Sequence, residues 1–154
     1  MKARTIVIAL ALCFLGAGVC LAQEAWMGTW KLNESKSKFA AGSGKNNTVV
    51  YEAAGDQVKV TVDGVDGEGK PSHNEWTGKF DGKEYPVTGD STSDMRSYKK
   101  VDDHTISLTG KKGGKTTLTA TITLSADGKS RTVKTKGTDS SGKKMSNTAV
   151  YDKQ

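Results

Sequence analysis

The stretch that decides the fold is Gly28-Thr29-Trp30-Lys31-Leu32. A glycine, one residue, and then a tryptophan open a segment that we expect to be a β-strand, since tryptophan and threonine favour strands. After residue 25, no window repeats apolar residues at the helical spacing i, i+3, i+4 and i+7 over three turns. We therefore expect an all-β domain that closes on Trp30.

The rest of the chain alternates with a period of two. Val58, Val60 and Val62 alternate with polar residues, and apolar side chains alternate with threonines over 117–124. Such strands keep one face in an apolar interior and the other in water. Turn signals at regular spacing separate them, for example Asp66-Gly67, Asp81-Gly82 and Asp127-Gly128.

These patterns predict ten short strands, near 27–33, 47–53, 57–64, 73–80, 84–88, 94–101, 104–110, 116–124, 130–138 and 145–152. Tight turns between consecutive strands give an antiparallel up-and-down order. Closure of the sheet removes its two free edges, so the expected fold is a β-barrel of about 8–10 strands.

Residues 1–22 are predicted to be a signal peptide that is not part of the barrel. Lys2 and Arg4 precede an apolar run over 6–15, and Cys20-Leu21-Ala22 supplies small residues for cleavage after Ala22. The run is shorter than the roughly 20 residues of a membrane span. We expect a secreted or periplasmic barrel domain over 23–154. Lipidation at Cys20 is the alternative.

Removal of the signal peptide also removes both cysteines, Cys13 and Cys20, so we expect neither a disulfide nor a thiolate metal site. Residues 23–154 carry 21 Lys/Arg and 17 Asp/Glu, a net charge of +4. The lysines are dispersed, mostly near predicted turns, which favours a role in solubility over binding of nucleic acid.

The connection over 33–46 is long, polar and poor in large apolar residues. Asn33 before Glu34-Ser35-Lys36 predicts a capped helical turn. The segment lies where a lid over the barrel mouth would lie, and a solvated loop pinned by Phe39 is the alternative.

Both ends of the mature chain resemble the fatty-acid-binding proteins. Gly28 to Leu32 followed by Lys38-Phe39 is similar to that family's first strand, and 148–153 is similar to its last. Lipocalins share the Gly-x-Trp start, so the resemblance supports the wider calycin class of barrels. It implies that Trp30 plugs the closed end of the barrel beneath a basic side chain, for which Arg131 is the candidate. Gly28, Trp30 and Arg131 would then be structural.

The chain departs from the fatty-acid-binding family at the ligand carboxylate. Tyr151 is kept, but Ala149 stands where the family has an arginine, and 33–46 is too short for the family's helical lid. The mature chain has only two arginines, Arg96 and Arg131. We therefore do not expect a fatty acid to be held by the family's own mechanism.

Four large side chains on predicted inner faces are the candidate ligand-binding residues: Tyr51, Trp76, Phe80 and Tyr151. They combine apolar area with polar tips, as binding pockets do. The alternative is that they fill a packed core.

No set of residues suggests catalysis, a metal or a cofactor. His73 and His104 have no second histidine or carboxylate at a metal-ligand spacing, and no phosphate-binding or nucleophile motif is present. We expect a monomeric binding protein for a small apolar or amphipathic molecule, not an enzyme.

The alternative is a packed barrel that acts through its surface, like a small protease inhibitor. Gln23 to Met27 or residues 33–46 would then contact the partner. A cavity above roughly 300 Å³ would favour the binding protein.

Overall fold

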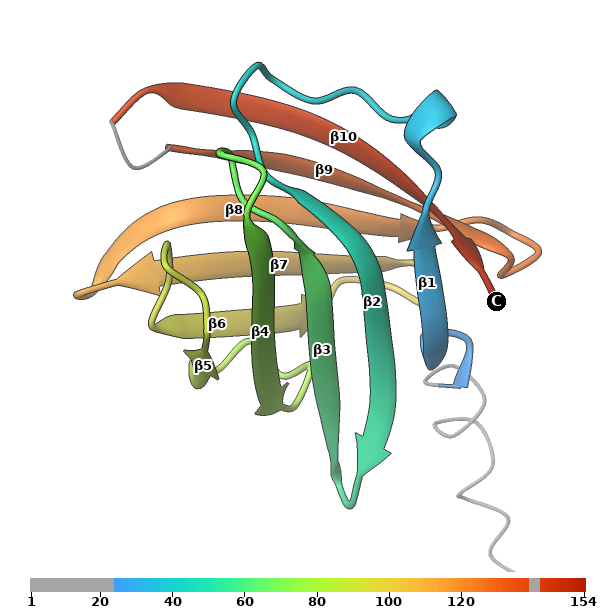
Figure 1. Cartoon of the computed structure of the whole chain (residues 1–154). Helices are drawn as coiled ribbons and strands as arrows, with labels where there is room; N and C mark the ends of the chain where they lie inside the picture. Colours follow the sequence, from blue (N-terminus) through green and yellow to red (C-terminus); the bar gives the residue numbers. More distant parts are fainter. Residues whose placement is uncertain (1–23, 139–141) are drawn as a thin grey trace, which may run out of the picture.

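The computed structural model describes residues 24–138 and 142–154, which form a closed barrel of ten antiparallel strands (Figure 1). The strands are β1 Gly28–Leu32, β2 Lys45–Ala54, β3 Gln57–Val65, β4 Pro71–Gly78, β5 Tyr85–Thr88, β6 Met95–Lys100, β7 Thr105–Lys112, β8 Lys115–Leu124, β9 Ser130–Thr138 and β10 Lys144–Lys153. Each pairs with the next along the chain, and β1 also pairs with β10 to close the barrel. The predicted all-β up-and-down fold is confirmed. The predicted signal peptide lies outside the described residues.

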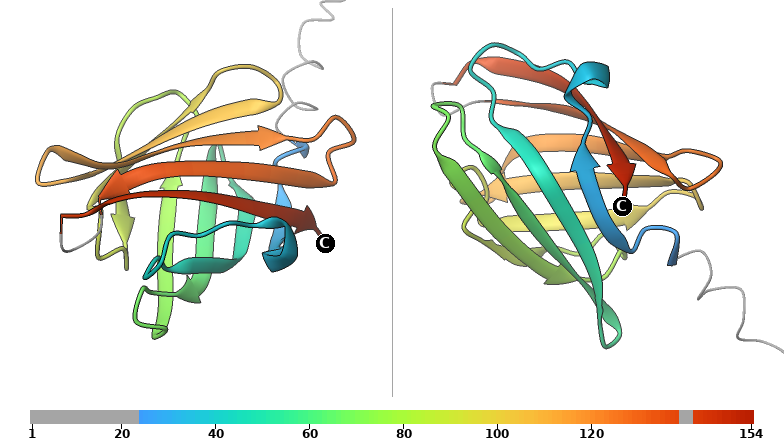
Figure 2. Two further views of the ribbon diagram at one scale, coloured as in Figure 1. Left: turned by 90° about the horizontal axis from the view of Figure 1, so that it is seen from above. Right: turned by 45° about the vertical axis from the view of Figure 1, so that its right-hand side comes forward.

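The barrel is flattened into two walls whose strands run in clearly different directions (Figures 1 and 2). We call β1–β5 the first wall and β6–β10 the second wall. The two walls are joined where β1 pairs with β10 and where β5 pairs with β6 through Tyr85↔Arg96 and Pro86↔Met95. In sequence, the boundary between the walls falls between β5 and β6, near residue 90.

Alternation places the expected apolar rows inside the barrel. Val58, Val60 and Val62 are buried on β3, and Ile122 and Leu124 are buried on β8. Their neighbours along each strand are polar and more exposed. Burial of these rows is the main source of stability of the barrel, since residues 23–154 contain no cysteine for a disulfide.

One end of the barrel is closed by tryptophan side chains. Trp30 on β1 is completely buried, and its indole N–H donates to the carbonyl of Trp26 at 3.0 Å. Trp26 is also buried, in the turn that precedes β1. Lys153 at the end of β10 donates to the carbonyl of Ala25 at 3.0 Å, so the two ends of the domain are tied together.

A strap formed by residues 37–44 closes the seam between β10 and β2 beyond the end of β1 (Figure 1). Before it, Asn33 caps the short 3-10 helix Glu34–Lys36 by accepting from the Lys36 N–H at 3.2 Å, as the sequence predicts. Lys38 then exchanges two backbone hydrogen bonds with Thr148 on β10. The Asn147 Oδ1 atom accepts from the Ala40 N–H at 2.8 Å and from the Ser43 hydroxyl at 3.2 Å. The strap therefore follows the edge of β10 instead of extending freely into solvent.

Candidate functional site

The barrel contains a partly open cavity of about 130 Å³ between its two walls. Tyr51 on β2, Tyr98 on β6 and Tyr151 on β10 line it together with Arg96 and Arg131. Apolar side chains complete the lining, among them Val49, Val62, Leu108, Leu118, Ile122 and Val133. The site thus has apolar walls with a few convergent polar groups, which is the usual composition of a small-molecule site.

Arg131 is the central charge of this cavity. It is only 2% exposed, and its Cζ atom lies 4.7 Å from the ring centroids of Trp30 and Tyr51 and 5.0 Å from that of Tyr151. Arg131 and Tyr151 are also direct partners in the β9–β10 register. The three aromatic faces attract the cation and partly offset its loss of hydration.

Two of the three nitrogen atoms of the Arg131 guanidinium nevertheless have no hydrogen-bond acceptor in the described residues. Its Nε and Nη1 atoms are buried and have no acceptor among residues 24–138 and 142–154, and no carboxylate in those segments pairs with it. A buried guanidinium without an acceptor is costly. An acceptor placed in the cavity would remove that cost.

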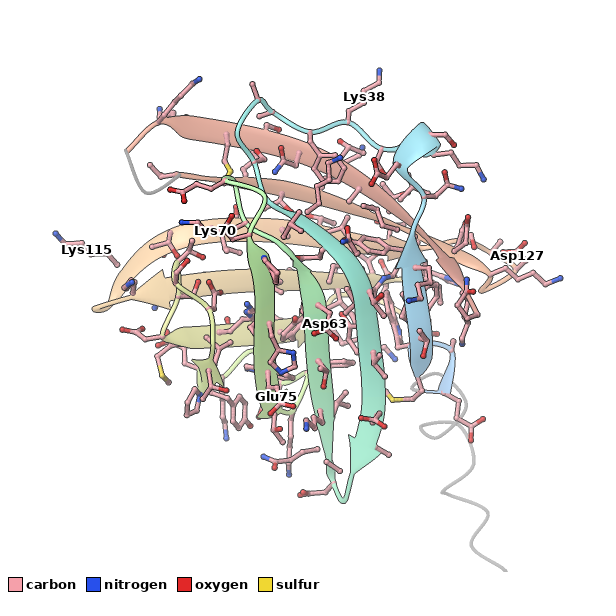
Figure 3. All side chains as sticks on the ribbon, viewed as in Figure 1. Lys38, Asp63, Lys70, Glu75, Lys115 and Asp127 are labelled. Carbon is pink, nitrogen blue, oxygen red and sulfur yellow. The ribbon has the colours of Figure 1, made fainter. Side chains whose placement is uncertain are left out.

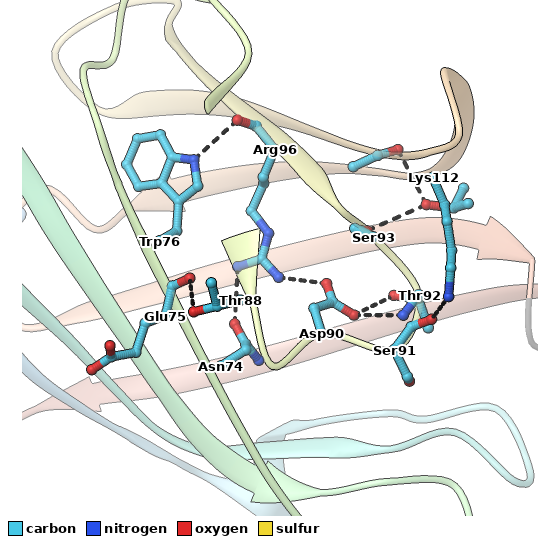
Figure 4. A network of polar contacts seen from close by, with 12 residues as sticks. Asn74, Glu75, Trp76, Thr88, Asp90, Ser91, Thr92, Ser93, Arg96 and Lys112 are labelled. Atoms are coloured by element: carbon cyan, nitrogen blue, oxygen red, sulfur yellow. Dashed lines mark hydrogen bonds and ion pairs between the residues drawn. The ribbon is translucent and has the colours of Figure 1, made fainter. Parts of the chain in front are cut away.

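Arg96, the second arginine at the cavity, has partners on one side only (Figure 4). Its Nη2 atom forms an ion pair with Asp90 at 2.7 Å, and its Nη1 atom donates to Asn74 at 3.1 Å. Both charged side chains are about nine-tenths buried, and the Arg96 Nε atom has no acceptor in the described part of the chain. Asp90 therefore neutralises the charge of Arg96, whereas the charge of Arg131 has no counter-ion in the described residues.

The loop 89–94 brings Asp90 to this position. Gly89 adopts φ +77°, and an added Cβ there would lie 2.2 Å from the His73 carbonyl, so only glycine fits. Burial raises the pKa of Asp90, but hydrogen bonds from Thr92 and the charge of Arg96 outweigh it, and the pKa lies below its ordinary value. Asp90 is therefore ionised at neutral pH.

Tyr98 and Tyr151, two of the cavity tyrosines, are neutral hydrogen-bond donors at physiological pH. Burial raises the pKa of Tyr151 to about 12, although Arg131 opposes part of the shift. Burial also raises the pKa of Tyr98 well above its ordinary value, with Tyr51 adding to the shift and Arg96 opposing it. Phenol O–H groups and guanidinium N–H groups together offer an excess of donors.

The four candidate ligand-binding residues separate into two groups. Tyr51 and Tyr151 line the cavity, while Trp76 and Phe80 do not. Trp76 stacks on Phe80 with ring centroids 6.4 Å apart, and its indole N–H donates to the Arg96 carbonyl at 3.0 Å. Trp76 and Phe80 therefore pack against each other beside the cavity. This position agrees with the alternative interpretation of the sequence, in which such residues fill a packed core.

Sequence reasoning missed Arg96 and Tyr98 as cavity residues. Arginine is mostly found on protein surfaces, so its inward position on β6 was not expected. The signal was present, because Arg96 and Tyr98 are two residues apart on a predicted strand and therefore share a face. The predicted partner of Trp30, Arg131, does lie over its ring.

A second concave feature is a groove of about 470 Å³ at the opposite end of the second wall from Trp30. It is lined by the ends of β8, β9 and β10, including Thr119, Lys136, Lys144, Met145 and Ser146. Leu118 lines both the groove and the interior cavity.

The described residues offer no cluster of three or more His, Cys, Asp or Glu side chains that is able to hold a metal ion. In the same residues, no helix is long and apolar enough to span a membrane.

Comparison with known proteins adds no relative to this picture. No protein-family model matches the chain, and a search of curated proteins finds no match.

Proposed function

We propose that this protein is an exported lipocalin-like barrel that binds a small amphipathic molecule with an anionic or hydrogen-bond-accepting group. The observation that carries the proposal is Arg131, a buried cation at a cavity, with two N–H groups that have no acceptor in the described residues. An anion or acceptor bound there would accept hydrogen bonds from these N–H groups and from the neighbouring tyrosine hydroxyls.

The cavity limits the size of this ligand. Its volume of about 130 Å³ does not reach the roughly 300 Å³ that would favour a small-molecule binding protein over a packed barrel, so the proposal depends on Arg131 and not on the size of the cavity. The volume is close to that of the cavity of about 150 Å³ that accepts benzene in an engineered protein. The proposal therefore favours a compact molecule of about one ring over a long acyl chain.

The alternative, a packed barrel that contacts a protein partner through its first residues or its strap, has less support. Trp26 is 1% exposed and closes the end of the barrel. Residues 38, 40 and 43 are hydrogen-bonded to β10. Neither segment is presented freely in the way that an inhibitory loop is.

Native mass spectrometry of the mature protein, purified from its own host, tests the proposal first. We expect a stoichiometric small molecule that extraction releases. Titration of the ligand-free protein with benzoate, toluene and benzylamine, followed by tryptophan fluorescence, then tests the chemistry. Benzoate should bind most tightly and benzylammonium least, because the cavity already holds an uncompensated cation.

Tyr51→Phe and Tyr151→Phe are the variants of choice, since they remove hydroxyl donors but keep the rings that pack on Arg131. Each should weaken benzoate binding about tenfold, the loss of one hydrogen bond to a charged group, while toluene binding stays unchanged. Equal affinity for all three probes, or a ligand-free mass with no fluorescence change, would contradict the proposal.

A further inference from the structure

Charge is divided between the two halves of the mature sequence. Residues 23–94, the half of the sequence that contains β1–β5 and the strap, include 8 Lys/Arg and 12 Asp/Glu, a net charge of −4. Residues 95–154, the half that contains β6–β10, include 13 Lys/Arg and 5 Asp/Glu, a net charge of +8. The mature net charge of +4 therefore conceals an acidic half and a strongly basic one.

The outer face of the second wall is made almost entirely of hydroxyl and ammonium groups. Register and alternation place three rows of residues side by side on β7, β8, β9, β10 and the strap. The rows are Thr109, Thr119, Lys136 and Ser146; Ser107, Thr121, Lys134, Thr148 and Lys38; and Thr105, Thr123, Thr132 and Val150. We call these thirteen residues the hydroxyl face.

The hydroxyl face has no carboxylate and no aromatic side chain among its thirteen residues. Its lysines 38, 134 and 136 are exposed and form no ion pair with the described residues. The nearest carboxylate on β10, Asp152, lies beyond the three rows and accepts a hydrogen bond from Asn33 at 2.7 Å.

The first wall differs in this respect. Several of its lysines are paired, as in Lys59–Glu75 at 2.7 Å and Lys79–Asp56 at 2.5 Å. Figure 3 shows Asp63 and Glu75 on the first wall, whereas Lys38 and Lys115 project from the strap and the second wall into open space. Elsewhere on the second wall, Lys100 pairs with Asp103 and Lys111 pairs with Glu84. The lack of ion pairs is therefore a property of the hydroxyl face and not of the whole wall.

The groove lies at the edge of the hydroxyl face and shares Thr119, Lys136 and Ser146 with it. Lys144 and Met145 add a further ammonium group and an apolar surface. The volume of about 470 Å³ is within the range of small-molecule sites. Hydroxyls, two lysines and a small apolar surface suit a sugar ring that carries an acidic group.

We infer that the hydroxyl face and its groove bind an acidic polysaccharide, a chain of sugars that carry carboxylate or sulfate groups. The lysines would neutralise the acidic groups, and the threonine and serine hydroxyls would exchange hydrogen bonds with the sugar hydroxyls. Single-stranded nucleic acid fits less well, because the face has no aromatic platform on which bases stack.

The test measures binding of the mature protein to polygalacturonate and heparin, with neutral dextran and a single-stranded DNA oligonucleotide as comparisons. We expect binding to both acidic polysaccharides that weakens as salt is added, no binding to dextran, and weaker binding to the DNA. Tighter binding to DNA than to either acidic polysaccharide, or no binding to these polysaccharides, would overturn the inference.

Two triple variants with the same change in net charge distinguish binding at the hydroxyl face from a general effect of net charge on binding. Lys134→Gln, Lys136→Gln and Lys144→Gln together should weaken polygalacturonate binding at least tenfold. Lys59→Gln, Lys70→Gln and Lys79→Gln together should change it less than threefold. Thermal unfolding checks that both variants are folded. Equal losses in the two variants would show that only net charge matters, which overturns the inference.

A substitution that keeps the net charge of the protein tests the role of the groove in binding. Ser146→Ile narrows it and should weaken binding of trigalacturonate about tenfold. Thr123→Ile, on the row of the face farthest from the groove, should have little effect. Equal affinities in both variants and in the unaltered protein would remove the groove from the inference. Tyr51→Phe should leave polysaccharide binding unchanged, so this result is independent of the interior cavity.

Discussion

Arg131 lies over Trp30 with 4.7 Å between its Cζ atom and the indole ring centroid, and both side chains are almost completely buried. Trp30 also contacts the cation of Lys153, whose Nζ atom lies 5.3 Å from the ring. The tryptophan that begins the barrel therefore packs against residues from its last two strands. This contact joins the two ends of the domain at the closed end.

Trp30→Ala should lower the free energy of unfolding by about 4 kcal/mol, because the cavity left by a buried indole is not filled by its neighbours. Urea unfolding of the mature protein measures the loss. Val101→Ala is the control, since Val101 is 60% exposed and should change stability by less than about 0.5 kcal/mol. An unchanged melting temperature in Trp30→Ala would contradict the structural role of Trp30.

Asp90→Asn should destabilise the protein by about 3 kcal/mol at neutral pH, because it leaves the buried Arg96 charge without its ion-pair partner. The Asp90 pKa is lower in the folded chain than its ordinary value of 3.8. The stabilisation by this carboxylate is therefore fully present above pH 3.8 and is lost as the pH falls through the folded pKa.

Chemical unfolding between pH 7 and pH 2 checks both statements. The difference in stability between the unaltered protein and Asp90→Asn should be largest at neutral pH and should shrink in acid. A difference that is constant over this range would exclude ionised Asp90 as its source.

Stability should also fall at alkaline pH because of the buried tyrosines. Below pH 10, the Tyr151 phenol is neutral in both the folded and the unfolded chain. Above pH 10 it ionises only when unfolded, until the pH approaches its folded pKa of about 12. This one group should lower the free energy of unfolding by about 1.4 kcal/mol per pH unit in that window.

Tyr151→Phe should reduce that alkaline slope by the contribution of one group. Chemical unfolding at pH 9, 10 and 11 measures it. Identical slopes for the variant and the unaltered protein would contradict the raised pKa of Tyr151.

Asn147→Ala should loosen the strap, because Asn147 Oδ1 accepts from both the Ala40 N–H and the Ser43 hydroxyl. Amide hydrogen exchange over residues 37–44 should become at least tenfold faster, while exchange in β3 and β8 stays unchanged. Asn147→Asp keeps the acceptor oxygen and should leave exchange in the strap close to that of the unaltered protein. Equal acceleration in both variants would contradict this role of Oδ1.

The sequence by itself determined the ten strands and their up-and-down order. These features depend on contacts between neighbours along the chain: a period of two predicts which face of a strand is buried, and glycine-containing turns join each strand to the next. Asn33 as the cap of a helical turn is equally local, because the cap and the N–H that it binds are three residues apart.

Only the tertiary structure decided which inward residues meet at the cavity and how the charges are arranged. Arg131 and Tyr51 are eighty residues apart in the sequence and become neighbours because the barrel closes. Trp76 and Phe80 also point inward, but the packing of the first wall places them against each other. Lys38 lies about one hundred residues before Lys134 and Lys136 in the sequence. Only the pairing of the strap with β10, and of β10 with β9, brings the three lysines together on the hydroxyl face.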